Sequence, residues 1–283
     1  MSSGVSIILP SAEFSPSFDQ EEVVLLHPSG FVDRGLRALH LLNDNGGTTF
    51  KDSMGGAPGN LDLLINSNNA FARLAGGGVA LSGAQFISFP AYEANGPWTM
   101  FTAGAIMGDV GSDFEKITGF VGHRTSYGVN ARGSYFYARG ATTWGSPANV
   151  TDFFHHRTNG DGDAVDESLS PIDQNAAAVH HLIAHSYDGS STLTSTLYDA
   201  AGAVVATGTL AATPAQLFTV SGTTVSMLQP IIGGISDVFD GAIQQFEFFA
   251  RYTVALSDFS EAEIQAQVAA AAGYGSARSR PWA

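Results

Sequence analysis

The sequence contains no cysteine, so neither disulfide bonds nor thiol chemistry contribute to this protein. A lack of disulfides is typical of proteins made in a reducing cytoplasm. No run of eighteen or more apolar residues occurs, which argues against a membrane span. Residues 1–6 lack the basic region and apolar core of a secretory signal. We therefore expect synthesis in the cytoplasm without a signal peptide, and release within a particle if the protein works outside cells.

Positive charge is also scarce. The chain has 12 Lys and Arg against 26 Asp and Glu, a formal charge of −14, and its only lysines are Lys51 and Lys116. This balance argues against nucleic acid as a partner, because phosphate neutralisation needs clustered basic residues. An anionic glycan would likewise need a local basic patch, and the sequence shows none. The acidity is best explained as a contribution to solubility.

What the chain does contain favours one large β domain. Apolar residues make up 44% of its 283 residues, charged residues only 13%, and there are 33 glycines. A chain of this length can bury a sizeable core without splitting into two domains. No period of 20 to 50 residues repeats, which argues against solenoids and propellers. Strands are expected at 36–42, 98–106, 116–121, 127–131, 134–138, 181–187, 194–199 and 203–206.

The C-terminal region predicts a short helix. Ser260 and Glu263 have the spacing of a capping box, and Ile264 and Val268 lie on one helical face. Gly273 is placed to end this helix. The capping role also explains why Glu261 and Glu263 stand so close together without a catalytic function.

The order of motifs near the C-terminus carries a family resemblance. Residues 231–249 place a strand, a Phe-Asp-Gly turn and a second strand with alternating faces before the Leu-Ser-Asp-Phe-Ser-Glu-Ala-Glu-Ile segment at 256–264 that starts the helix. This order, with a Gly-x-x-Leu-x-Gly-x-x-Phe-Ile hairpin at 78–87 turning at Gly83, resembles laminin-G-like jelly rolls of the concanavalin A-like lectin/glucanase superfamily. The resemblance covers roughly residues 35 to 272. It implies an all-β fold, a two-sheet antiparallel β-sandwich with a short C-terminal helix.

The domain organisation follows from this resemblance. We assign residues 35–283 to the jelly-roll domain. Residues 1–34 form either an N-terminal arm that attaches the domain to a larger assembly or its first strands, since periodicity alone does not separate the two.

No enzymatic motif is present, and we expect no catalytic activity. Glucanases of this superfamily carry paired carboxylates on one strand, and glycoside hydrolysis needs two such groups across the scissile bond. The corresponding Glu-x-Asp-x-Glu pattern is absent. Nucleophile-elbow, phosphate-loop and dinucleotide patterns are absent too, and residues 76–78 are best explained as a glycine turn.

An acidic stretch offers a candidate calcium site. Residues 149–175 are predicted to be one long irregular loop, in which Asp161, Asp163 and Asp166 supply the hard oxygen ligands that calcium prefers. The spacing is not that of an EF-hand, because Ala164 and Ser170 stand where glycine and glutamate are needed. A solvated acidic loop without metal is the alternative. The histidine pairs at 155–156 and 180–181 with His185 are not expected to bind metal, because four residues along a strand span about 13 Å.

Aromatic residues in the middle of the chain are the candidate ligand site. Trp144 lies in a Gly-Ala-Thr-Thr-Trp-Gly-Ser-Pro segment, and Tyr135 and Tyr137 alternate on a predicted strand beside Arg139. Flat aromatic faces with polar neighbours suit sugar rings. Packing of these rings in the core is the alternative.

Together these features predict a non-catalytic structural or adhesive subunit of a phage or phage-like particle. The family resemblance implies a spike, fibre or head decoration, displayed on the particle surface as a homo-oligomer. The partners would be a host surface glycan and, through the N-terminal arm, other particle proteins. Two alternatives stay open: a secreted or surface bacterial carbohydrate-active protein, either a binding module or a hydrolase, and a purely architectural virion subunit without a ligand.

Overall fold

The computed structural model describes the chain from residue 24 onward, with gaps. The described residues are 24–43, 47–63, 72–81, 85–93, 96–107, 117–124, 133–140, 150–158, 164–173, 179–214, 217, 219–220, 223–224, 227–233, 243–277, 280 and 282. In some strands, including most of residues 117–173, the description covers the backbone alone.

Two antiparallel sheets make up the described part of the chain. The first contains, in spatial order, β15 (Val204–Ala211), β14 (Thr192–Tyr198), β13 (His181–Tyr187), β8 (Trp98–Met107), β19 (Ile243–Tyr252), β5 (Val79–Leu81) and β4 (Ala72–Arg73), and β1 (Leu36–His40) also pairs with β19. We call it the helix-side sheet. Its centre is β8, as the alternation of small and apolar residues at 98–106 predicts.

The second sheet, which we call the outer sheet, contains β12 (Ala164–Asp173), β11 (Val150–Thr158), β10 (Gly133–Gly140), β9 (Ile117–Arg124), β18 (Met227–Gly233), β6 (Gln85–Ser88), β3 (Gly59–Leu63) and β2 (Thr49–Phe50), and β7 (Tyr92–Glu93) also pairs with β18. A separate pair, β16 (Thr219–Val220) and β17 (Thr223–Thr224), completes the described strands. The predicted two-sheet sandwich with a C-terminal helix is thus confirmed.

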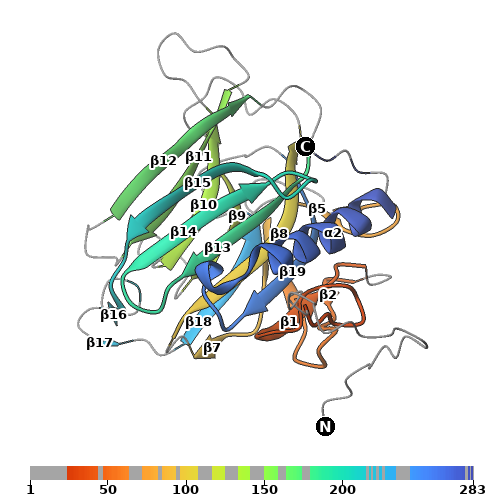
Figure 1. Cartoon of the computed structure of the whole chain (residues 1–283), viewed down its shortest axis with the longest axis horizontal. Helices are drawn as coiled ribbons and strands as arrows, with labels where there is room; N and C mark the ends of the chain where they lie inside the picture. The colour runs from red at the N-terminus through yellow and green to blue at the C-terminus, as the bar shows by residue number, and fades with distance from the viewer. Residues whose placement is uncertain are drawn as a thin grey trace, which may run out of the picture.

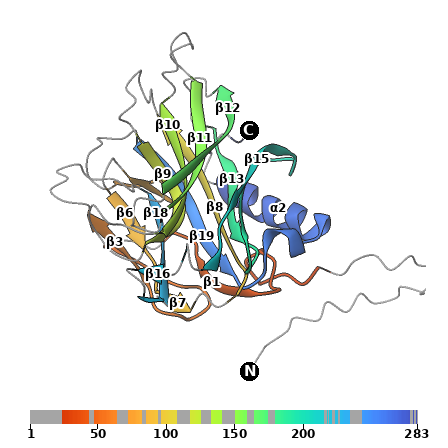
Figure 2. The same ribbon diagram turned by 90° about the vertical axis from the view of Figure 1, so that its left-hand side faces the viewer.

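The chain forms three layers: the outer sheet, the helix-side sheet and a helix. One apolar core lies between the two sheets, and a second lies between the helix-side sheet and the helix. The sheets stack face to face, and helix α2 (Glu261–Ala277) covers the other face of the helix-side sheet (Figures 1 and 2). Along β8, Trp98 and Met100 point between the sheets, whereas Phe101 points toward the helix. The central strands of this sheet are therefore buried on both faces, whereas its edge strand β15 is largely exposed.

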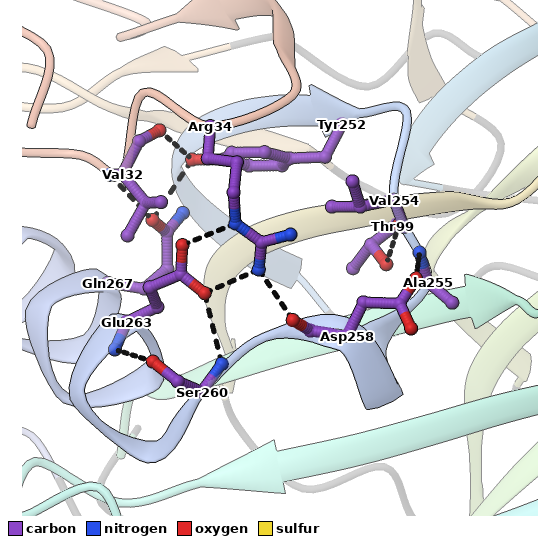
Figure 3. Close-up of polar contacts among 10 residues, drawn as sticks. All are labelled: Val32, Arg34, Thr99, Tyr252, Val254, Ala255, Asp258, Ser260, Glu263 and Gln267. Atoms are coloured by element: carbon purple, nitrogen blue, oxygen red, sulfur yellow. Dashed lines mark hydrogen bonds and ion pairs between the residues drawn. The ribbon is translucent and has the colours of Figure 1, made fainter. Parts of the chain in front are cut away.

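A polar network holds the start of α2 in place (Figure 3). The Ser260 hydroxyl accepts a hydrogen bond from the Glu263 amide at 3.2 Å, and the Glu263 carboxylate accepts one from the Ser260 amide at 3.0 Å. This is the predicted capping box. The Glu263 carboxylate also accepts a hydrogen bond from Nε of Arg34 at 2.7 Å. Further along the helix, the Tyr252 hydroxyl donates a hydrogen bond to the Gln267 side chain at 3.0 Å.

The helix continues beyond its predicted end. Val268 is buried and Ile264 packs beside it, as predicted, but α2 passes through Gly273 and ends at Ala277. Gly273 does not adopt the positive φ of a helix-terminating glycine. Tyr274 packs against Phe31 with ring centroids 5.7 Å apart, so tertiary contact stabilises the last turns.

Two sequence-based predictions of local structure were wrong. Residues 78–89 do not form a hairpin, because β5 joins the helix-side sheet and β6 joins the outer sheet. Gly83 lies outside the described residues. The stretch 149–175 is not one irregular loop, because β11 and β12 pair over most of it. The loop prediction followed from the glycines and acidic residues of this stretch. It gave too little weight to β-branched and aromatic residues such as Val150 and Phe153, which favour strands.

The segment before β1 contributes to the core under α2. Phe31 and Val32 are buried there, and Leu26 forms an isolated bridge with Val32. The proposed arm at residues 1–34 falls largely outside the described residues, and its boundary with the domain stays a prediction. Among the described helices, none has the length and apolar character needed to cross a membrane.

Candidate functional site

A hollow of about 150 Å³ opens at the end of the sandwich where β1 and β19 of the helix-side sheet meet β6 and β18 of the outer sheet. The labels of β1, β7 and β18 mark this end in Figure 1. Its charged lining residues are Arg37, Asp52 and Arg251. The remaining lining residues are small or apolar: Ala38, Gly56, Ala57, Phe89, Pro90, Ala91, Pro230 and Phe249.

Strand pairing brings the two arginines to the same place. In the ladder between β1 and β19, Leu36 faces Tyr252 and Ala38 faces Arg251, so Arg37 is an extra residue opposite the partner strand. Such a β-bulge redirects side chains, and bulges are frequent beside functional sites. This one lets Leu36 and Leu39 both pack under α2 and leaves Arg37 exposed at the hollow.

Aromatic rings form one wall of the hollow. Phe89 and Phe249 stack in parallel with centroids 3.9 Å apart, and they join the two sheets at this end. The Arg251 guanidinium lies over the ring of Tyr92, 4.0 Å from its centroid. A cation held on an aromatic face keeps its N–H groups available around its edge. Within the described residues, Arg251 makes no hydrogen bond or ion pair that would use these donors.

Asp52 supplies the acceptor of the hollow. Its Oδ1 accepts hydrogen bonds from the backbone N–H groups of Leu39 at 3.0 Å and Met54 at 2.9 Å, which orient the carboxylate. Oδ2 accepts no hydrogen bond from the described residues. Gly56 lies directly against Oδ2, where a Cβ atom would collide with it. A glycine at this position therefore leaves that oxygen accessible.

The electrostatics of Arg251 follow from this setting. Burial is the main cause that lowers the pKa of its guanidinium, and the like charge of Arg37 lowers it further. Tyr92 and Asp52 act in the opposite direction. Burial also raises the pKa of the Tyr92 hydroxyl, which keeps that ring neutral beside the cation. The hollow thus combines two guanidinium groups, one carboxylate and aromatic surface.

The predicted aromatic site is not part of this hollow. Trp144 lies outside the described residues. For Tyr135, Tyr137 and Arg139 the structure describes only the backbone, which pairs with His156, Phe154 and Asp152 of β11. Their role in ligand binding stays a prediction.

The predicted calcium ligands also have no described side chains. Asp161 and Asp163 lie outside the described residues, and Asp166 is described only as a backbone position of β12 opposite His156. Across the part of the chain whose side chains are described, no three His, Asp or Glu residues gather as metal ligands would.

The histidines on β13 are structural. His185 is buried between the sheets, with Ser134 of the outer sheet 2.9 Å from its Nε2 and Ser195 of β14 2.9 Å from its Nδ1. His181 is also buried, and burial is the main cause of its lowered pKa.

Sequence reasoning missed the hollow because its polar residues come from distant segments. Arg37 and Arg251 are far apart in the chain, and Asp52 belongs to neither strand. One signal was available. Arg251 directly follows three apolar residues, Phe248 to Ala250, in the second half of β19, where a charged residue needs an explanation.

The sequence matches no protein-family model and no curated protein. Among solved structures, the chain is similar to a Trypanosoma rangeli sialidase in complex with sialic acid, with a TM-score of 0.53 at 11% identity, over 85% of this chain and 33% of that one. It is similar to the botulinum neurotoxin serotype D binding domain, with a TM-score of 0.51 at 8% identity, over 83% of this chain and 51% of that one.

A third similar structure is botulinum neurotoxin type C, described as dependent on interaction with two ganglioside molecules for cell entry, with a TM-score of 0.50 at 8% identity, over 86% of this chain and 51% of that one. The chain thus spans between a third and about half the length of the proteins it matches. At these identities the similarity shows the fold alone, an antiparallel β-sandwich.

Proposed function

We propose that this chain is a non-catalytic glycan-binding subunit and that the hollow beside Arg251 holds the sugar. The observation that carries the proposal is the Arg251 guanidinium, which is half-buried, stacked on Tyr92 and without a hydrogen-bonding partner in the described chain. Sugar hydroxyls both donate and accept hydrogen bonds. They can therefore pair with the guanidinium and with Oδ2 of Asp52 at the same time.

The fold comparisons support this proposal. The sialidase structure contains sialic acid, and cell entry of the type C neurotoxin depends on gangliosides, so proteins that contain such a sandwich act on or bind glycans. Those activities belong to longer chains, of which the matched part covers 33% and 51%. For this chain, glycan binding therefore remains a proposal that the hollow itself must justify.

The charged groups of the hollow support binding rather than cleavage. Hydrolysis of a glycosidic bond ordinarily needs a second carboxyl group, about 5 to 10 Å from the first. Asp52 is the sole acidic group among the described lining residues. Its Oδ1 also accepts hydrogen bonds from the backbone N–H groups of Leu39 and Met54, which leaves Oδ2 as its acceptor for a ligand.

We also propose that the chain works as a surface subunit of a phage or phage-like particle, where it attaches to polysaccharide of the host cell. The cysteine-free composition and the resemblance to jelly rolls of such particles support this placement. A hollow that admits one sugar unit gives weak individual contacts. Several copies on one particle would convert them into useful avidity.

A single variant tests the binding site. Gly56→Val places a branched side chain against Asp52 and into the hollow, whereas Gly96→Val adds the same bulk where no atom lies within 4 Å of the new Cβ. We expect the natural chain and Gly96→Val to be retained on immobilised surface polysaccharide and Gly56→Val to elute with the solvent. The bound polysaccharide should keep its length. Equal retention of all three proteins would contradict the site, and release of reducing sugar would contradict the non-catalytic role.

A further inference from the structure

We propose that the hollow selects a sugar that carries a carboxylate and holds that carboxylate between Arg37 and Arg251. This inference rests on the proposed glycan binding and specifies the class of sugar. It reverses an expectation from the sequence, which shows no basic patch for an anionic glycan. The bulge in β1 creates such a patch by placing Arg37 beside Arg251.

The two arginines form an incompletely satisfied pair of like charges. Neither makes an ion pair or a hydrogen bond with any residue that the structure describes. The charge of Arg37 disfavours that of Arg251, and the surrounding protein screens the two less than bulk water would. An anion between them replaces this repulsion with two attractions. No comparable gain follows from a neutral sugar.

The geometry of the groups favours a carboxylate as that anion. A guanidinium is planar and presents parallel N–H groups, which match the two oxygens of a carboxylate. Arg251 is held flat on Tyr92, so its fork is already oriented before a ligand arrives. Pre-orientation reduces the conformational entropy that binding would otherwise cost.

Asp52 disfavours anions of higher charge. A phosphate monoester carries about −1.5 to −2 at pH 7 and would bring more negative charge close to this carboxylate than the single charge of a sugar acid. A sugar acid presents one carboxylate to the arginines and hydroxyl donors to Oδ2 of Asp52, so both kinds of charge in the hollow are satisfied.

The size of the hollow limits how much of the ligand enters. At about 150 Å³ it is comparable to a cavity that admits benzene. A hollow of this size takes in part of one sugar residue and does not hold a chain of several. We therefore expect a terminal residue or a one-residue branch of the polysaccharide to insert, with the rest of the polymer outside.

The test compares each acid with its own methyl ester, which has the same ring without the charge. Glucuronic acid, galacturonic acid and N-acetylneuraminic acid, each with its methyl ester, are titrated against the full chain by NMR or calorimetry. Charge-assisted hydrogen bonds predict that an acid that fits binds roughly 10-fold or more tightly than its ester. Comparison of the three acids shows whether the hollow prefers the carboxylate of a uronic acid or that of a sialic acid.

Three variants assign the effect to the hollow. Arg37→Gln and Arg251→Gln should each remove the preference for the acid, and Arg251→Lys should keep only part of it because lysine lacks the planar fork. Lys51→Gln removes the same charge from an exposed residue that does not line the hollow, so it should leave the preference intact. Arg37 is exposed in a bulge, and Arg37→Gln therefore tests the inference even if Arg251→Gln fails to fold.

The outcomes separate this inference from the function on which it rests. A preference for the acid that Arg37→Gln abolishes and Lys51→Gln preserves would support it. Equal affinity for acid and ester, or equal loss in Lys51→Gln, would overturn the carboxylate inference while leaving glycan binding in place. Failure of every sugar and of the polysaccharide to bind would overturn both proposals.

Discussion

Glu247 is a fully buried carboxylate whose charge is balanced by the C-terminal segment. It is the extra residue of a bulge in β19, between Phe246 opposite Gly104 and Phe248 opposite Ala103. Arg280 donates from Nε to Glu247 Oε1 at 2.8 Å, and the Nε2 atom of His180 lies 3.4 Å from the same oxygen.

Arg280 also donates to two backbone carbonyls in the turn before β5, so it joins this turn to the carboxylate. Replacement by methionine keeps the length of the side chain and removes its charge. Loss of one partner of a buried ion pair costs about 3–5 kcal/mol. Arg280 is 14% exposed, so water can partly solvate the carboxylate that remains.

We therefore expect Arg280→Met to lower the free energy of unfolding by about 3 kcal/mol, near the lower end of that range. For a protein of this size, the loss corresponds to a fall in Tm of roughly 6–12 °C. Urea unfolding followed by circular dichroism measures it. Arg37→Met is the matched control, because Arg37 is exposed and has no ion pair in the described structure. It should change stability by about 0.5 kcal/mol or less.

A double-mutant cycle with Glu247→Gln isolates the pair itself. Once the carboxylate is neutral, Arg280→Met should cost much less than it does in the natural protein, with a coupling of about 1.5 kcal/mol or more. Unchanged midpoints for Arg280→Met, or additive costs in the cycle, would refute the reasoning that a buried charge depends on the C-terminal arginine.

Two further predictions concern the cap of α2 and the turn before β5. The hydrogen bond from Arg34 is the main cause that lowers the pKa of Glu263 below its ordinary value of 4.5. The ionised carboxylate therefore stabilises the fold above pH 4.5, and this contribution is lost as the pH falls through the lowered pKa. Glu263→Gln should therefore cost about 1 kcal/mol at pH 7 and little at pH 3, and urea unfolding that showed the same cost at both values would be evidence against this coupling. Gly78 has φ +82°, and an added Cβ would lie 2.8 Å from the carbonyl oxygen of Phe246. Gly78→Ala should lower thermal stability by about 1–3 kcal/mol and Gly96→Ala should not, a contrast that calorimetry would detect and that equal melting temperatures would contradict.

Features that depend on near neighbours were predictable from the sequence. The alternation at 98–106 identified the central strand, the apolar patterns at 181–187 and 194–199 identified β13 and β14, and the spacing of Ser260 and Glu263 identified the helix cap. Each of these signals arises within a few residues of its own position. The sandwich followed from their order along the chain.

Features that depend on face and partner were not predictable in this way. Simple alternation puts Phe246 and Phe248 on one face, but the bulge at Glu247 sends Phe246 between the sheets and Phe248 under the helix. The apparent hairpin at 78–89 failed similarly, because its two strands join different sheets. A single extra residue in a strand moves every later side chain to the opposite face of the sheet. The sequence around the bulge gives no signal of its position.

The sequence by itself determined that this chain forms a cysteine-free, two-layer β protein closed by a capped helix, because periodicity and capping are local properties. The tertiary structure decided where positive charge gathers in a protein of net charge −14. Arg37 and Arg251 meet only because β1 pairs with β19 and one bulge redirects a side chain. Which strands pair across such a large sequence separation depends on how all the strands pack together, so it cannot be read from the residues near either strand.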